Sequence, residues 1–148
     1  RYGDPDATDD ELWEALRVAQ AEDFVREMPD GLESPISQGG TNVSGGQRQR
    51  IAIARALVSK ADIYLFDDAF SALDVATDAR LRAALRPVTR DAAVIVVAQR
   101  VSTILHADRI VVLDEGRVVG SGSHEELLET CPTYLEIVQS QQAIEEAA

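Results

Sequence analysis

Three short apolar runs after residue 60 constrain the fold more than any other feature of the sequence. They are Asp62–Asp67, Ala92–Val97 and Arg109–Asp114. Each is a nearly continuous run of apolar residues, as is typical of a buried strand in a parallel sheet. A helix is predicted over Val75–Arg86, between the first two runs. Strands that alternate with helices indicate an α/β layer built on a parallel sheet.

The first sixty residues carry helix signals and no strand signal. Thr8 and Glu11 form a capping box, with apolar residues following on one helical face. A second short helix is predicted over Glu22–Met28, and Ser34–Gly40 reads as a loop. We therefore expect a helical subdomain over residues 1–60 and an α/β part over residues 61–148.

The chain after the second apolar run shows further boundaries. We expect Pro87 to end the preceding helix, and Val101–His106 to form a short helix. Arg117–Gly120 is predicted to pair with the third run as an antiparallel hairpin. A capping box at Ser123–Glu126 opens a helix to about residue 129, and Cys131-Pro132 should break it before a last helix over residues 133–144.

A candidate anion site lies where a polar segment runs into a strong helix pattern. Ser44 is a good N-cap, and Gly45 and Gly46 let the backbone approach a ligand closely. The free N–H groups and the dipole at such a helix start favour a phosphate. Taken alone, Ser-Gly-Gly is equally compatible with an ordinary junction between a loop and a helix.

A second group of polar residues follows the predicted strands. Asp67 and Asp68 end the first run, where ligands bind in open α/β sheets. A carboxylate there can hold Mg²⁺, and the next can orient or deprotonate an attacking water. Gln99 follows the second run at the same edge, and Ser71–Asp74 lies just past the carboxylates. The alternatives are a polar turn and, for Asp74, a plain helix N-cap.

Composition excludes several classes of protein. The formal net charge of −12 argues against nucleic acid as a partner. No apolar run approaches the roughly 18 residues that span a membrane, so we expect the chain itself to be soluble. The single Cys131 rules out an intrachain disulfide. Lys60 is the only lysine, so the chain holds no Gly-x-x-x-x-Gly-Lys phosphate loop.

Taken together, these motifs resemble the nucleotide-binding domain of an ATP-binding-cassette (ABC) transporter over nearly the whole chain. Val43–Gln47 resembles the signature motif, Ile63–Asp68 the Walker B motif, Ser71–Asp74 (Ser71, Ala72, Leu73 and Asp74) the D-loop, and Val97–Arg100 the switch segment. Arg1–Thr8 and Ser34–Gly40 resemble the exporter class. The resemblance implies a partial P-loop NTPase (RecA-like) sheet with an N-terminal helical subdomain that includes the signature helix.

In that family two such domains stack head to tail, with each ATP between the phosphate loop of one and the signature helix of the other. The resemblance therefore implies that Ser44, Gly45, Gly46 and Gln47 contact a partner's ATP. It also implies that Asp67 holds Mg²⁺ and that Ser34–Gly40 contacts the coupling helices of a transmembrane domain. The parent protein would then act at the cytoplasmic face of the cell membrane.

Three positions depart from the family pattern. Asp68 stands where the catalytic residue is normally Glu, and Gln99 stands where the switch residue is normally His. Asp is one methylene shorter, and a shortfall of roughly 1 Å can reduce a rate about 10²-fold. Gln38 replaces a Glu in the loop before the signature. An intact signature beside a weakened own site resembles the degenerate-site subunit of a heterodimeric exporter.

Other interpretations stay open on the sequence. The phosphate loop, the adenine-stacking aromatic and the membrane helices would all precede Arg1, so we expect a carboxyl-terminal fragment that is inactive alone. Such a fragment should expose an apolar sheet edge and have marginal stability. The alternatives to a heterodimer subunit are a slow homodimeric transporter ATPase, a non-transporter ABC ATPase that acts on chromosomes, and a non-enzymatic interaction module.

Overall fold

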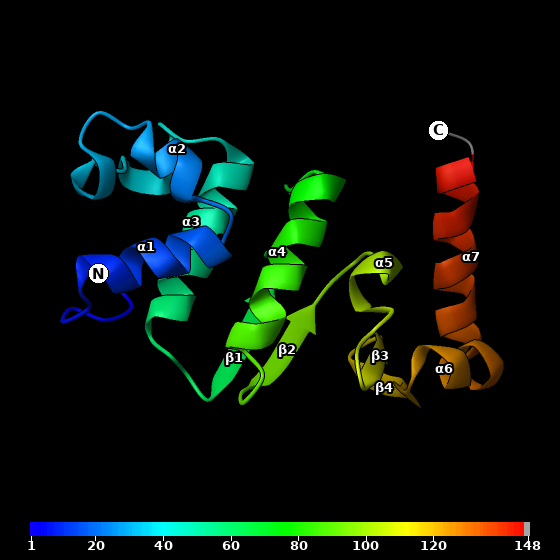
Figure 1. The fold of residues 1–148 in the computed structure, drawn as a ribbon. Helices are drawn as coiled ribbons and strands as arrows, with labels where there is room; N and C mark the ends of the chain where they lie inside the picture. The colour runs from blue at the N-terminus through cyan, green and yellow to red at the C-terminus, as the bar shows by residue number, and fades with distance from the viewer. Residues whose placement is uncertain (147–148) are drawn as a thin grey trace. The chain divides into compact units, whose positions relative to one another are not determined.

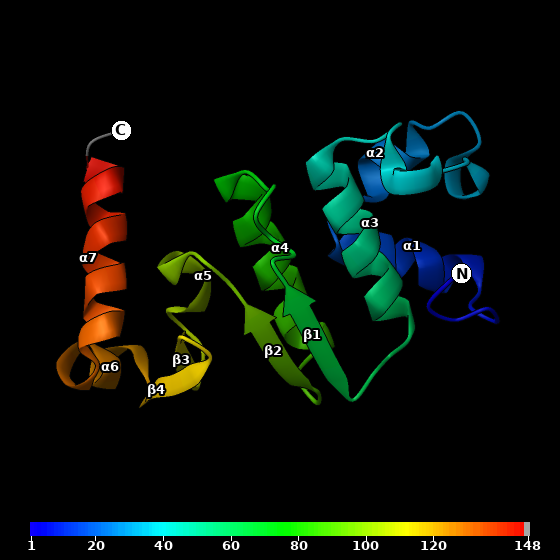
Figure 2. The same ribbon diagram turned by 180° about the vertical axis from the view of Figure 1, so that it is seen from behind.

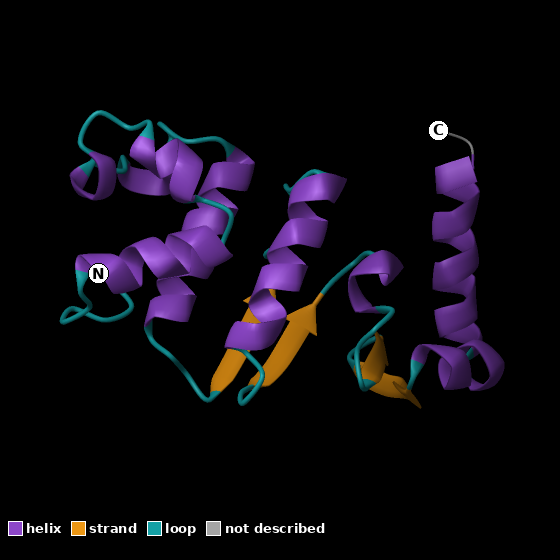
Figure 3. Ribbon diagram, in the orientation of Figure 1, coloured by secondary structure: helices purple, strands orange, loops and turns teal. Residues whose placement is uncertain are grey.

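The computed structural model describes residues 1–146, which divide into two compact units, 1–95 and 96–146. Figure 1 shows the order of the elements along the chain. Figure 3 shows that helices dominate the first unit up to its strands. Among the described residues, no helix is both long and apolar enough to cross a membrane.

Three helices build the N-terminal part of the first unit. Helix α1 spans Asp9–Val18, α2 spans Glu22–Arg26 and α3 spans Gly45–Val58. The capping box predicted for α1 is present, because the Thr8 hydroxyl accepts from the Glu11 N–H and Glu11 accepts from the Thr8 N–H. Helix α1 packs against α3. The buried residues of the two helices include Leu12, Ala15 and Leu16 on α1 and Ile53, Ala54 and Leu57 on α3. Residues 1–60 contain no strand, as the sequence predicted.

The loop between α2 and α3 is tied down by side chains. It contains two 3₁₀ turns, η1 (Gly31–Glu33) and η2 (Gln38–Gly40). The Asn42 side chain accepts from the Ser37 N–H at 2.9 Å and donates to the Pro35 carbonyl at 2.9 Å. Arg48 on α3 donates to the Gly39 carbonyl at 3.0 Å. The exposed loop is therefore fixed to the start of α3.

A β–α–β unit follows. Strand β1 (Ile63–Asp67) and strand β2 (Ala93–Val97) are hydrogen-bonded neighbours joined by α4 (Val75–Val88). Figure 2 shows the two strands side by side and pointing the same way, with α4 on one side of them. This is the parallel pair that the alternation of strands and helices predicted.

The prediction that these two strands are buried was wrong in part. Tyr64 and Phe66 lie on one face of β1, where both are buried and stack at 6.2 Å between ring centroids. On the other face Ile63 and Leu65 are 63% and 65% exposed, and every residue of β2 is exposed or half-buried. An apolar run therefore marked each strand correctly but did not indicate how many faces of the strand are covered.

The second unit is a hairpin packed on two helices. Strand β3 (Ile110–Asp114) pairs antiparallel with β4 (Arg117–Gly122), as predicted, with an irregularity between Val112 and Leu113. Helices α5 (Val101–Ile104), α6 (His124–Thr130) and α7 (Pro132–Glu146) complete it. Its core comprises Val101, Ile110, Val112, Leu127, Cys131, Tyr134 and Val138.

Two prolines sit differently from the prediction. Pro87 lies inside α4, which continues to Val88 instead of ending before the proline. Pro132 is the first residue of α7, whereas we expected that helix to begin at Thr133. Proline is well suited to a first helical position, because its fixed φ is already helical and its missing N–H needs no partner there.

Candidate functional site

The segment predicted to bind an anion forms the start of α3. Ser44 is its N-cap: the hydroxyl oxygen accepts from the Gln47 N–H at 3.1 Å, and the Gln47 side-chain oxygen accepts from the Ser44 N–H at 2.9 Å. In this capping box the Ser44 hydroxyl oxygen and the Gln47 side-chain oxygen both act as acceptors. The Ser44 hydroxyl hydrogen and the Gln47 amide hydrogens are still able to donate to a phosphate oxygen.

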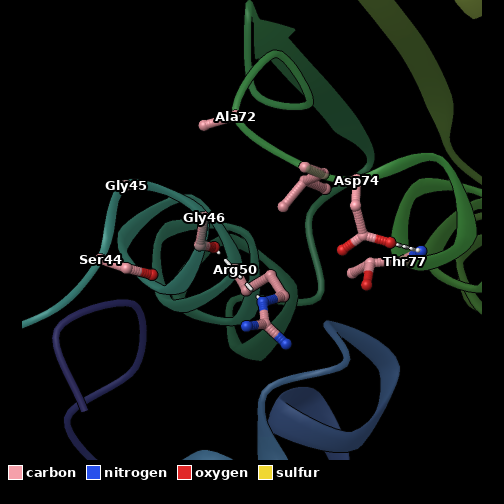
Figure 4. Close-up of a pocket in the computed structure, with 8 residues that line it drawn as sticks. Ser44, Gly45, Gly46, Arg50, Ala72, Asp74 and Thr77 are labelled. Atoms are coloured by element: carbon pink, nitrogen blue, oxygen red, sulfur yellow. Dashed lines mark hydrogen bonds between the residues drawn. The ribbon is translucent and has the colours of Figure 1, made fainter.

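A pocket of about 430 Å³ opens at this helix start (Figure 4). Ser44, Gly45 and Gly46 line it from the side of α3. The opposite side comprises Ala72, Leu73, Asp74 and Thr77. The structure therefore brings the signature-like segment and the D-loop-like segment to one cavity.

The two glycines differ in what surrounds them. A Cβ on Gly45 would lie 3.7 Å from the Ala72 Cβ, which is an ordinary contact. A Cβ on Gly46 would lie only 3.0 Å from the Ala72 carbonyl oxygen. Gly46 thus lets α3 pack closely on the segment after β1. It also leaves the N–H groups at the start of α3 accessible.

Arg50 brings a positive charge to the pocket. Its Nε donates to the Gly46 carbonyl at 3.3 Å, and its NH1 group donates to the Gln20 carbonyl. The guanidinium lies over the Phe24 ring, 4.8 Å from the ring centroid. Burial lowers the pKa of Arg50, but an arginine stays protonated at neutral pH. Arg50 therefore ties α3 to the segment that follows α1, and it places a cation in the same pocket as the Asp74 carboxylate.

The carboxylate pair lies at the end of β1. Asp67 is the last residue of the strand, and both Asp67 and Asp68 are exposed. Asp68 has a left-handed backbone, with φ of 49°. Its carbonyl oxygen accepts from the Ser71 N–H at 3.4 Å and the Ser71 hydroxyl at 3.1 Å. The chain thus turns sharply at the residue expected to be catalytic.

Gln49 on α3 contacts the same turn. Its side-chain Nε2 donates to the Asp68 carbonyl at 3.1 Å and to the Ser71 hydroxyl at 3.0 Å. Its Oε1 accepts from the Ala72 N–H at 2.9 Å. The second turn of the signature helix is therefore bonded to the segment 68–72.

The rest of the D-loop-like segment leads into α4. Asp74 is the N-cap of α4, with its carboxylate accepting from the Thr77 N–H at 2.9 Å, as predicted. Hydrogen bonds from the Thr77 side chain and backbone hold the pKa of Asp74 below its usual value. Leu73 is buried, whereas Ser71 and Ala72 are exposed. Exposed residues at this point are accessible to another molecule.

Gln99 lies in the second unit, between β2 and α5. Its carbonyl oxygen accepts from the Gln141 side chain at 2.7 Å, and the Gln141 oxygen accepts from the Val101 N–H at 2.8 Å. These bonds fix the backbone that carries Gln99. Its proximity to Asp68 stays a prediction.

The donor set at the end of β1 suits a magnesium ion that arrives with a nucleotide. Mg²⁺ is usually held by one or two carboxylates together with phosphate oxygens and waters. Asp67 and Asp68 are adjacent, exposed carboxylates and can supply that share. Among the described residues no group of three or more His, Cys, Asp and Glu side chains is arranged to hold a metal by itself.

Sequence reasoning missed Gln49, Arg50 and Thr77. The polar run Gln47–Arg50 in a helix that otherwise packs through apolar residues was a signal that this helix end has polar partners. It could not identify those partners, because Gln49 bonds to residues 19 to 23 positions away.

The sequence is similar to those of known ABC transporter proteins. The pattern of the ABC transporter family matches residues 5–71. An uncharacterized ABC transporter ATP-binding protein of Mycobacterium tuberculosis (strain ATCC 25618 / H37Rv) is 56% identical over 144 residues, which are 95% of this chain and 24% of that protein. An ATP-dependent lipid A-core flippase of Francisella tularensis (subsp. tularensis, strain SCHU S4 / Schu 4) is 46% identical over 91% of this chain and 22% of the flippase.

A solved structure shows the same fold. The structure of a bacterial Atm1-family ABC exporter with ATP bound superposes with a TM-score of 0.90 at 38% identity, over 95% of this chain and 24% of that one. The chain thus spans about a quarter of the length of the relatives that it matches.

Proposed function

Because this chain belongs to the ABC transporter family as part of its ATP-binding domain, we propose that it helps to bind and hydrolyse ATP for transport in an exporter. In this proposal residues 1–60 are the helical subdomain and residues 61–148 are the carboxyl-terminal part of the ATPase core. The observation that carries it is the pocket between the start of α3 and the segment Ala72–Thr77. The exporter that superposes on this chain was solved with ATP bound, which supports the choice of ligand.

The chemistry of the pocket suits the terminal phosphate of an ATP held by a second domain. The first turn of α3 offers backbone N–H groups, the Ser44 hydroxyl and the Gln47 amide, and its dipole favours negative charge. Gly45 and Gly46 keep the approach clear of side chains. Ser71 and Ala72 are exposed beside it, so a partner domain that stacks head to tail can contact both segments.

We further propose that this chain is the degenerate-site subunit of a heterodimer. At its own site Asp67 would hold Mg²⁺, which neutralises charge on the phosphate oxygens when bound. Asp68 would orient the attacking water, but its shorter side chain reduces the rate about 10²-fold. Gln99 can hydrogen-bond a phosphate but cannot change its charge. The signature segment that it would offer to its partner is intact in sequence, and its capping box is formed.

The loop Ser34–Gly40 is the proposed contact with the coupling helices of a transmembrane domain, at the cytoplasmic face of the membrane. Ile36 is exposed there, as is Gln38, and Asn42 and Arg48 bond the loop to the start of α3. A displacement of the loop would therefore reach the nucleotide pocket directly. The net charge of −12 makes nucleic acid a poor partner for this surface.

The test uses the full-length transporter that contains this chain, purified with and without its presumed partner subunit. ATP turnover is measured for the wild type, for Ser44→Arg and for Asp68→Glu combined with Gln99→His. We expect strong turnover only with the partner. Ser44→Arg should abolish most of it, because a long cation at the N-cap removes the capping hydroxyl and fills the pocket. Ser140→Arg on the exposed side of α7 is the matched control and should leave turnover unchanged.

The other outcomes separate the alternatives. Equal turnover without any partner would refute the heterodimer and leave a slow homodimeric ATPase. In that case Asp68→Glu with Gln99→His should raise turnover about 10²-fold. Turnover that survives Ser44→Arg would refute the role of the pocket itself.

A further inference from the structure

Gln49 is the one residue of the signature helix whose side chain bonds at both ends to the turn after β1. Its Nε2 donates to the Asp68 carbonyl and to the Ser71 hydroxyl, and its Oε1 accepts from the Ala72 N–H. The three donor–acceptor distances are 3.1 Å or less. An amide side chain can donate and accept at once, which a carboxylate or an ammonium cannot do. Both the Nε2 and the Oε1 of Gln49 therefore make hydrogen bonds to this turn.

The turn that Gln49 contacts has an unfavourable backbone conformation that requires stabilising contacts. Asp68 adopts a φ of 49°, in the left-handed region that residues with a Cβ enter only at a conformational cost. Such backbones persist where the surroundings over-determine them, typically at functional sites. Here the Asp68 carbonyl accepts from Ser71 and from Gln49, and the Ser71 hydroxyl is itself held by Gln49.

We propose that Gln49 is a positioning residue for the reaction at this chain's own ATP site. It fixes the left-handed turn at Asp68, so that the carboxylate is aimed from β1 at the reacting phosphate. This inference rests on the proposed function for the identity of the reaction. Because Gln49 and Ser44 lie on the same helix, α3 ties the carboxylate of one ATP site to the signature segment of the other.

A purely structural role for Gln49 makes different predictions. If it only stabilised the domain, its loss would loosen many regions and lower ATP affinity and turnover together. If it positions Asp68, its loss changes the segment 68–72 alone and lowers kcat while KM for ATP is kept. An error of about 1 Å in the position of a catalytic group is enough for roughly 10²-fold.

The first measurement is hydrogen exchange by mass spectrometry on the full-length transporter. In Gln49→Ala we expect amides in the peptide that covers residues 68–72 to exchange about five- to tenfold faster, the factor for one hydrogen bond lost. In Gln49→Glu the carboxylate still accepts from the Ala72 N–H, so this amide should stay protected. Gln139→Ala, an exposed glutamine on α7, is the control and should change nothing. Unchanged exchange at 68–72, or faster exchange throughout the domain, would overturn the proposal.

The second measurement is kinetic. Turnover at this chain's own site is isolated in a transporter that carries Asp68→Glu and Gln99→His to repair that site and Ser44→Arg to block the other. Adding Gln49→Ala should lower kcat at least tenfold with KM within twofold, and Gln49→Glu should do the same because it cannot donate to the carbonyl at position 68. A kcat within twofold of the parent in either variant would overturn the proposal.

The two measurements test the proposed function and the role of Gln49 independently. If the repaired transporter shows no turnover from its own site, the proposed repair of a degenerate site is wrong. The exchange result then decides alone whether Gln49 holds the turn, since it requires no hydrolysis.

Discussion

The close approach of Gly46 to the segment after β1 leads to a prediction that needs no nucleotide. Gly45 and Gly46 are the first two residues of α3, and both belong to the predicted anion site. Only Gly46 faces a backbone atom, with the Ala72 carbonyl oxygen 3.0 Å from the position of a new Cβ. Gly46→Ala should therefore destabilise the fold, whereas Gly45→Ala should not.

The size of the effect follows from the two contacts. A methyl group forced into a well-packed contact typically costs about 1–3 kcal/mol. The gain of up to about 1 kcal/mol from replacing glycine in a helix applies to both positions and cancels in the comparison. With a urea m-value of about 2 kcal/mol/M, the midpoint of Gly46→Ala should lie about 0.5–1.5 M below that of Gly45→Ala.

Urea unfolding of the 148-residue chain measures this difference. Trp13 is the only tryptophan and lies on α1, which packs on α3, so its fluorescence reports the helical part of the first unit. Equal midpoints for the two variants would show that the close contact with Ala72 does not exist. A midpoint of Gly45→Ala below that of Gly46→Ala would reverse the assignment of the two glycines.

Three further predictions concern stability and are checked by urea unfolding followed by far-UV circular dichroism, which reports the helices of both units. Leu81 on α4 is fully buried, so Leu81→Ala should lower the free energy of unfolding by about 2–5 kcal/mol. The hydrogen bond from Lys60 lowers the pKa of Glu11 from 4.5 to about 2, so its stabilising effect is complete above pH 4.5 and is lost as the pH falls toward 2. Glu11→Gln should flatten the loss of stability between pH 5 and 3, and an unchanged slope would contradict this. Tyr134 has its hydroxyl 2.8 Å from His124 Nδ1, so Tyr134→Phe should lower stability by about 0.5–1.5 kcal/mol, and no change would mean that this bond contributes nothing.

Local chemistry predicted the elements well. Capping residues such as Thr8, Ser44, Asp74 and Ser123 signal helix starts through bonds to residues three positions on, and all four bonds are present. These interactions depend only on neighbours in the chain. The candidate site residues were placed at the ends of elements from such local patterns, and their roles stay predictions.

Contacts between distant segments could not be predicted in this way. The turn at Asp68 accepts a hydrogen bond from Gln49, 19 positions away on α3, and no local sequence signal predicts that contact. The exposed face of β1, with Ile63 and Leu65, has the same apolar pattern as a face that is covered. Burial on both sides is a property of what packs against a strand, which a single run of residues does not encode.

The left-handed backbone of Asp68 also bears on why a less reactive residue can be favoured there. Aspartate and asparagine enter this region more readily than glutamate does, because a short polar side chain can bond to nearby backbone groups. A glutamate would extend the carboxylate further but would hold the turn under greater strain. On the proposed assignment of this chain to a degenerate site, position 68 would be a local instance of a stability–activity trade-off, in which an easier backbone conformation comes with a shorter carboxylate.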